Sequence, residues 1–191
     1  TTTGTTTGTS RDGIYARNEG TDLTINAAAT TIGGSHGISA RNEGTGDLTI
    51  NAATTTGGRN GIQAKNEGTG ALSITTSGKT TGTGGDEIVA SGIDASIDNA
   101  DSTGNLMINA AETEGGVYGI RAVNKGKGAL SITTTGNTTG IKDELAQTGF
   151  DEFTLYQSNG IYASIDNAAS TGDLTIVTGE FDAEGNLIKS V

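Results

Sequence analysis

Few residues in this sequence have the type and spacing that enzyme chemistry needs. The chain has no cysteine, which excludes disulfides and thiolate metal sites, and its one histidine, His36, has no second histidine to complete a metal site. His36 lies in the segment GGSHG, where we expect a surface turn residue. Adjacent carboxylates at Asp86–Glu87 and Asp151–Glu152 are of the type that glycosidic cleavage uses, but adjacency alone does not make a catalytic pair. We therefore expect no catalytic residue.

Calcium is the metal whose ligands, carboxylates and carbonyls, this sequence could supply. The segment TGTGGDEIV is similar to one copy of the Gly-Gly-x-Gly-x-Asp calcium repeat, but it lacks that spacing and is not repeated. The segment SIDNADSTGN offers Asp98 and Asp101, whereas its counterpart SIDNAASTGD offers Asp166 alone at the matching place. We expect no metal and no cofactor.

The segment IKDELAQTGFDEFTLYQSN (141–159) differs in composition from the rest of the chain, because it holds two of the three Phe residues among acidic neighbours. Aromatic residues beside acids are typical of a surface that binds another protein. The predicted binding residues are Asp143, Glu144, Phe150, Asp151, Glu152, Phe153 and Tyr156. The alternative is that Phe150 and Phe153 fold back on the scaffold and KDELAQ forms a short helix.

The elements that must carry these residues are repeats. Gly-Ile pairs that open a unit begin at 13, 37, 61, 92, 119 and 160, and a Leu-x-Ile motif alternates with them, beginning at 23, 48, 72, 106, 130 and 174. The plain unit is 24 residues long, and units of this length indicate a solenoid. With 32 Gly and a formal charge of −11, composition alone would predict disorder, but the periodicity overrules it.

Within a unit the apolar residues recur at every second position. Ile14 and Ala16, then Leu23 and Ile25, share one face of a strand, and intervening residues such as Tyr15 take the other. The pattern predicts an all-β fold, a parallel β-helix of about six coils, with a Gly-Ile strand, a Leu-x-Ile strand and a Thr-rich third side in each. We expect residues 1–191 to be a single β-helix fragment of a longer rod, with insertions at about 79–91 and 141–159 and either a terminal hairpin or the start of another coil at 179–191. Residues 61–118 are repeated as a block in 119–178.

Two sets of polar residues recur beside the Gly-Ile motif. An asparagine follows the glycine by five residues at Asn18, Asn42, Asn66 and Asn124. Asparagine side chains bond their own turn and tolerate a left-handed backbone, so we interpret this column as structural. A basic column, Arg17, Arg41 and Lys65, lies beside an acidic column, Glu19, Glu43 and Glu67. We expect these two columns to form a balanced, solvated edge.

The phrases GIxAxNEGTGxLTINA, with the Thr-Gly stretches before each Gly-Ile, cover nearly the whole chain. In these repeat motifs the sequence resembles the passenger region of bacterial autotransporters (type V secretion). Its repeats are most similar to those of autotransporters of bartonellae. The resemblance implies a right-handed parallel β-helix, translocated by an outer-membrane barrel of the same protein that is not present in this chain. It also implies an extracellular or Gram-negative surface location. No signal peptide or C-terminal cap is identifiable.

That group includes a released passenger that acts on endothelial cells through the vascular endothelial growth factor receptor and promotes angiogenesis. The resemblance therefore implies a host cell-surface protein, such as that receptor, or extracellular matrix as partner. Nucleic acid is excluded as a partner because the 11 basic residues are scattered in an acidic chain. We expect a non-catalytic virulence factor, an adhesin or receptor-binding effector. The alternatives are a spacer that presents a distal functional region and, less favoured, a β-helix enzyme acting on polysaccharide.

Overall fold

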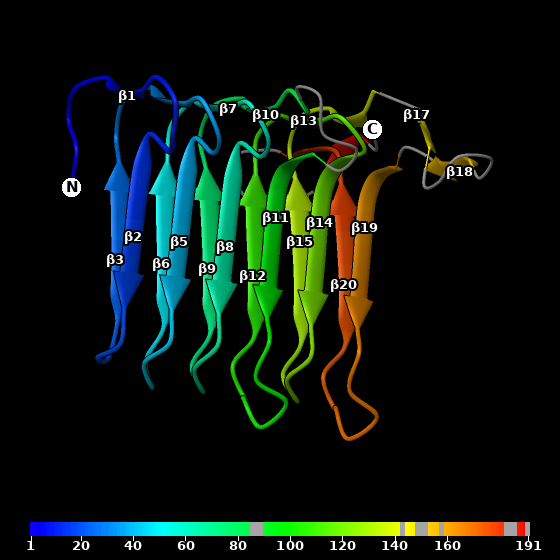
Figure 1. The fold of residues 1–191 in the computed structure, drawn as a ribbon. Coiled ribbons are helices and arrows are strands. Elements are labelled where there is room, and N and C mark those ends of the chain that lie inside the picture. The colour runs from blue at the N-terminus through cyan, green and yellow to red at the C-terminus, as the bar shows by residue number, and fades with distance from the viewer. Residues whose placement is uncertain (85–89, 142–143, 148–152, 157–158, 182–186, 190–191) are drawn as a thin grey trace.

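The computed structural model describes residues 1–84, 90–141, 144–147, 153–156, 159–181 and 187–189. Three sheets of six parallel strands form the body of the molecule, and each coil contributes one strand to each sheet (Figure 1). The predicted fold, an all-β parallel β-helix of about six coils, is confirmed. Across the described ranges there is no helix long and apolar enough to pass through a membrane.

The three sheets follow the three sequence motifs. The Thr sheet contains β1 (Thr6–Gly8), β4 (Thr31–Gly33), β7 (Thr55–Gly57), β10 (Thr80–Gly82), β13 (Thr113–Gly115) and β16 (Thr138–Gly140). The Gly-Ile sheet contains β2 (Ile14–Asn18), β5 (Ile38–Asn42), β8 (Ile62–Asn66), β11 (Ser91–Ile97), β14 (Tyr118–Asn124) and β19 (Asn159–Ile165). The Leu sheet contains β3 (Leu23–Ala27), β6 (Leu48–Ala52), β9 (Leu72–Thr76), β12 (Leu106–Ala110), β15 (Leu130–Thr134) and β20 (Leu174–Thr178).

The core consists of columns of identical residues in register. Ile38 pairs with Ile62, and Leu48 pairs with Leu72, and all four side chains are fully buried. Because side chains alternate across a strand, the same strands send every second residue outward. Burial of one such Ile or Leu contributes about 1.5 to 3 kcal/mol. A shift of register by one residue would expose the whole column, so the repeats fix the stacking.

The glycine of each Gly-Ile pair is required by close packing. A Cβ built at Gly37 would lie 2.4 Å from the Thr55 methyl carbon and 2.6 Å from the Gly61 oxygen. Thr55 belongs to an inward column of the Thr sheet, and its hydroxyl has no hydrogen-bond partner among the residues described. The column therefore uses threonine for the shape of its methyl group, which fills the space beside glycine.

Two lengths of turn join the Gly-Ile sheet to the Leu sheet. The narrow turns, 19–22, 43–47, 67–71 and 125–129, follow β2, β5, β8 and β14. The wide turns, 98–105 and 166–173, follow β11 and β19 and extend furthest from the coils at the lower edge of Figure 1. Their shared length reflects the sequence block that occurs twice.

Two antiparallel pairs lie outside the three long sheets. One is β17 (Glu144–Gln147) with β18 (Phe153–Tyr156), between β16 and β19; the other is β21 (Glu180–Phe181) with β22 (Leu187–Lys189). The helix considered for KDELAQ is wrong, because Glu144–Gln147 is a strand. In the range 79–91, Thr80–Gly82 is strand β10 of the coil itself, so the extra residues of that coil follow it.

Candidate functional site

A shallow groove of about 500 Å³ crosses the outer face of the Gly-Ile sheet. Its lining comes from five successive strands, β2, β5, β8, β11 and β14, so the groove runs along the rod and across the strands. One outward column contributes Tyr15, Ser39, Gln63, Asp94 and Arg121, and the next contributes Arg41, Lys65, Ser96 and Val123. Asp98 and Lys125, just past their strands, and the small residues Ala40 and Ala64 complete the lining.

A continuous chain of ion pairs, here called the charge ladder, borders and enters the groove. The Arg17 guanidinium donates to both carboxylate oxygens of Glu43, at 2.8 and 2.6 Å, and Glu43 also pairs with Arg41 at 2.8 Å. Arg41 and Lys65 then share Glu67, at 2.7 and 2.9 Å. Lys65 and Lys125 share Asp98, at 2.9 and 2.8 Å. The predicted basic and acidic columns therefore alternate across coils as ion pairs.

Three groups at the centre of the ladder, Glu67, Asp98 and Lys65, have a pKa shifted toward the charged form. The hydrogen bond from Arg41, followed by that from Lys65, lowers the pKa of the Glu67 carboxyl. Burial opposes ionisation of Asp98, but hydrogen bonds from Lys125 and Lys65 outweigh it, so the pKa of Asp98 is also lowered. The pKa of Lys65 is raised by its hydrogen bonds to Asp98 and Glu67. All these groups therefore stay ionised at neutral pH and hold fixed positions.

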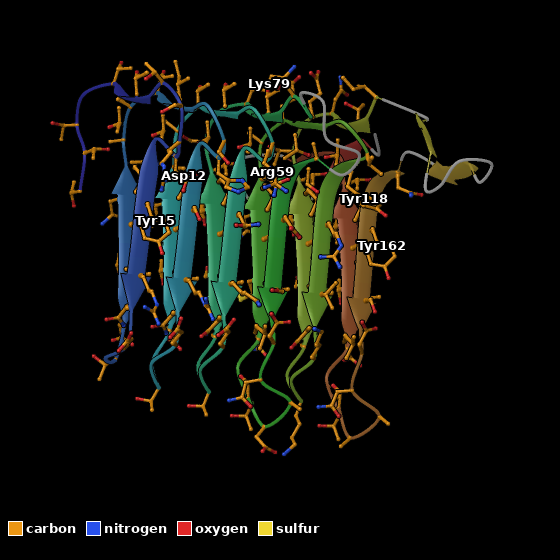
Figure 2. All side chains as sticks on the ribbon, in the orientation of Figure 1. Asp12, Tyr15, Arg59, Lys79, Tyr118 and Tyr162 are labelled. Carbon is orange, nitrogen blue, oxygen red and sulfur yellow. The ribbon has the colours of Figure 1, made fainter. Side chains whose placement is uncertain are left out.

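A second cluster lies at the β19 end of the groove. The Arg121 guanidinium bonds the Asp94 carboxylate at 3.0 Å, and its central carbon lies 6.0 Å from the Tyr162 ring centroid. The rings of Tyr162 and Tyr118 are tilted, with centroids 5.7 Å apart. Figure 2 shows Tyr15 at one end of the Gly-Ile sheet and Tyr162 at the other. Exposed aromatic rings therefore flank a polar floor at both ends.

The asparagine column lies at the ends of strands β2, β5, β8 and β14. The Asn66 amide donates to the Gly70 and Ala71 oxygens at 3.0 and 2.9 Å, and its oxygen accepts from the Gly68 N–H at 3.1 Å. Asn124 makes the corresponding bonds to Gly128 and Gly126, and Asn18 donates to the Asn42 oxygen at 2.8 Å. The column bonds its own narrow turns without a left-handed backbone, since no described residue other than glycine has a positive φ.

Serine takes over this task in the wide turns. Ile97 occupies the strand position that Asn66 and Asn124 hold in neighbouring coils. The Ser102 hydroxyl donates to the Thr69 oxygen at 2.9 Å and accepts from the Gly104 N–H at 3.1 Å. Ser170 repeats the arrangement with Lys127 and Gly172. Sequence reasoning did not identify these serines, although their equal spacing in the two wide turns was a usable signal.

The predicted binding segment 141–159 is described only in part. Glu144 lies at the start of β17, and Phe153 and Tyr156 bound β18, so these three belong to one antiparallel hairpin. Glu144 is the register partner of Tyr156. The predicted residues Asp143, Phe150, Asp151 and Glu152 lie outside the described residues.

The structure does not bring together the residues considered for metal binding and catalysis. Both oxygens of Asp98 are paired, one with Lys65 and the other with Lys125. Asp101 pairs through one oxygen with Lys127 at 2.9 Å. The described ranges contain no cluster of three His, Cys, Asp or Glu able to hold a metal ion. Asp86 and Glu87 lie outside the described residues. His36 is 8% exposed, so the prediction of a surface residue is wrong. Its backbone N–H donates to the Asp12 carboxylate at 3.0 Å.

Comparison with known proteins gives no relative. No protein-family model matches the chain, and searches of curated proteins and of solved structures return no match. The groove offers preorganised hydrogen-bonding groups and rings and the hairpin lies outside the sheets, an arrangement suited to binding.

Proposed function

We propose that this protein is a non-catalytic binding passenger, secreted or displayed at a Gram-negative surface, that contacts a host cell-surface protein or matrix component. The hairpin β17–β18 is its contact element. The observation that carries this proposal is the unbroken register around the insertion: β13 pairs β16 before it, and β14 pairs β19 after it. A segment that leaves the scaffold undisturbed is free to vary for recognition.

The scaffold around the hairpin also supports binding over catalysis. The carboxylates of the outer face are held in ion pairs, as with Asp94 to Arg121 and Asp98 to Lys65. General acid–base catalysis needs a carboxyl group whose pKa is near the working pH, and the pKa of Asp98 is shifted the opposite way. The sequence resemblance to autotransporter passengers makes the vascular endothelial growth factor receptor the first candidate partner.

The test replaces residues 141–159 with residues 58–60, which separate Gly57 from the next Gly-Ile pair in an uninterrupted coil, so that Gly140 and Gly160 take the plain spacing. Both forms are used to capture proteins from endothelial surface extracts and to bind the purified receptor ectodomain. Capture by the intact form alone supports the proposal. Equal capture by both forms would refute the hairpin as contact element, and circular dichroism checks that both forms are folded.

A spacer is the second candidate. It is favoured by the register of the coils, in which Ile14, Ile38 and Ile62 stack without a shift. Such a rod would hold a distal region away from the cell. If neither form captures a protein and neither binds the ectodomain, the spacer is the better explanation.

A further inference from the structure

The groove on the outer face of the Gly-Ile sheet is long and straight. It is lined from β2 to β14, which at the usual strand spacing is a span of roughly 19 Å. The strands lie side by side in a straight row (Figure 1). A ligand that follows the groove must therefore be an extended chain that contacts side chains of successive coils in turn.

Charge in the groove is cancelled locally. Each charged residue of its lining has an opposite partner: Arg41 with Glu67, Lys65 and Lys125 with Asp98, and Arg121 with Asp94. The chain as a whole has a formal charge of −11. A polyanion is repelled by the molecule and finds no unpaired cation in the groove. The electrostatics therefore favour an uncharged ligand.

The groove also lacks what a peptide needs. Four of its five strands, β5, β8, β11 and β14, are internal to the six-stranded sheet, so their N–H and C=O groups are already used in pairing with neighbours. Addition of a peptide as an extra strand requires a free edge, and the one edge here is that of β2. A peptide added there would run parallel to β2, across the end of the rod, and not along the groove. Val123 is the one large aliphatic side chain in the lining, and it is 3% exposed. The floor of this groove therefore has no aliphatic pocket for the anchor residues that protein partners use.

Hydroxyl recognition fits the groups that remain. Ser39, Gln63 and Ser96 line the floor together with N–H donors of Arg41 and Arg121, which have more donors than their ion pairs use. Tyr15 is 68% exposed and lines the β2 end, and Tyr162 flanks the other end. Aromatic rings present an apolar face with a polar tip, which suits the faces of sugar rings.

We propose that this groove binds an uncharged, extended polysaccharide chain of the β-1,4-linked type. The chain lies along the rod, with its hydroxyls on the polar floor and its rings against the two tyrosines. This site lies on the Gly-Ile sheet, outside the hairpin β17–β18, and goes beyond the function proposed above. Polysaccharide binding here needs no catalytic group.

The first test is calorimetric titration of the intact protein with cellohexaose and chitohexaose. Binding of at least one is expected, with affinity unchanged between roughly 50 and 500 mM salt, because no net charge is neutralised. Maltohexaose, whose linkage curves the chain, is expected to bind at least about tenfold more weakly because it cannot follow a straight groove. Failure of both β-1,4 probes would overturn the proposal, as would salt-sensitive binding of a heparin hexasaccharide in their place.

The second test locates the site. Tyr15→Ala and Gln63→Ala are each expected to weaken the binding by about tenfold, since each removes a contact on the outer face. Asn51→Ala is the matched control, because its amide lies on the outer face of the Leu sheet, bonded to Asn26 at 2.9 Å. Equal effects at Gln63 and Asn51 would overturn the placement. The form lacking 141–159 should bind the sugar unchanged, so failure of this inference is distinguishable from failure of the hairpin proposal.

Discussion

The narrow turn after β8 and the wide turn after β11 do the same work with different residues. In the narrow turn, Asn66 ends the strand, faces the interior and bonds the turn backbone. In the wide turn, Ile97 fills that interior position and Ser102, five residues later, bonds the backbone. The comparison shows that the interior column accepts either residue, provided that the turn supplies the missing hydrogen bonds. Turn length and column residue are therefore coupled.

Ile97→Asn should break this coupling most severely. The substituted amide would be buried with too few partners, because Ser102 already bonds the wide turn and the column neighbours Asn66 and Asn124 already bond their own turns. Loss of the Ile side chain and an unsatisfied amide together should lower the free energy of unfolding by about 4 kcal/mol or more. Urea denaturation measures it, and Ile97→Val, expected to cost about 1 kcal/mol, is the control. A loss below about 1 kcal/mol for Ile97→Asn would contradict the coupling.

Asn66→Ala tests the narrow side of the comparison. It removes two donated bonds and two accepted bonds, the one from Asn42 being long at 3.5 Å, in a fully buried position. We therefore expect a loss of about 2 to 3 kcal/mol in unfolding free energy. The same change at Asn18, which is only partly buried in the first coil, should cost less because water replaces the bonds. Thermal unfolding of the two variants makes the comparison. Equal losses would show that burial of the column is unimportant.

Ser102→Ala tests the wide side. The hydroxyl contributes one donor and one acceptor, so we expect a loss of about 1 to 2 kcal/mol, smaller than at Asn66. Ser96→Ala, which removes only a 3.4 Å contact to Asp98 on the outer face, should be close to neutral. Urea denaturation of both variants checks this difference. If Ser102→Ala were neutral too, serine could not be the counterpart of asparagine.

The charge ladder joins coils with narrow turns to coils with wide turns. Substitutions in it should have the smallest effect on stability. The pKa of Glu67 and the pKa of Asp98 are both lowered in the folded state. The two carboxylates therefore stabilise the folded protein above their unfolded pKa values of about 4. This contribution to stability is lost as the pH falls through their folded pKa values. Melting temperatures measured between about pH 5 and pH 2 should fall less steeply in Glu67→Gln and in Asp98→Asn than in the parent. An unchanged slope would mean that the ladder adds nothing to stability. Many exposed ion pairs make no measurable contribution of this kind.

The fold could be predicted because its determinants recur. Ile and Leu at alternate positions, repeated in six units, specify both strand and register, and Ile38–Ile62 and Leu48–Leu72 pair as that pattern requires. Hydrogen bonding by the Asn column also follows from sequence. Its backbone conformation does not, since the side chains bond the turns from ordinary strand ends.

The groove could not be predicted in the same way, because most outward positions that line it differ from coil to coil. Asp94 and Arg121 occupy one column as an opposite-charge pair that no other coil contains. Lys125 occurs where other units carry an acid, and only the stacking shows that it shares Asp98 with Lys65. His36 looked exposed because its neighbours are Gly and Ser, yet stacking of the coils buries it. The sequence of the hairpin β17–β18 occurs once, so no repeat pattern indicated its strands.

The self-matching columns have a consequence for how such a molecule can grow. Each coil presents to the next the same Ile, Leu and Thr that it receives, so a duplicated block stacks on its parent without redesign, as 119–178 does on 61–118. The two insertions leave the Thr sheet after β10 and β16, which are two coils apart in the sheet order. Each further duplication would add one attachment point about 10 Å along the rod. Gene duplication thereby lengthens the rod and adds binding segments to it, which makes the protein multivalent. The strand repeat sets the spacing of these segments.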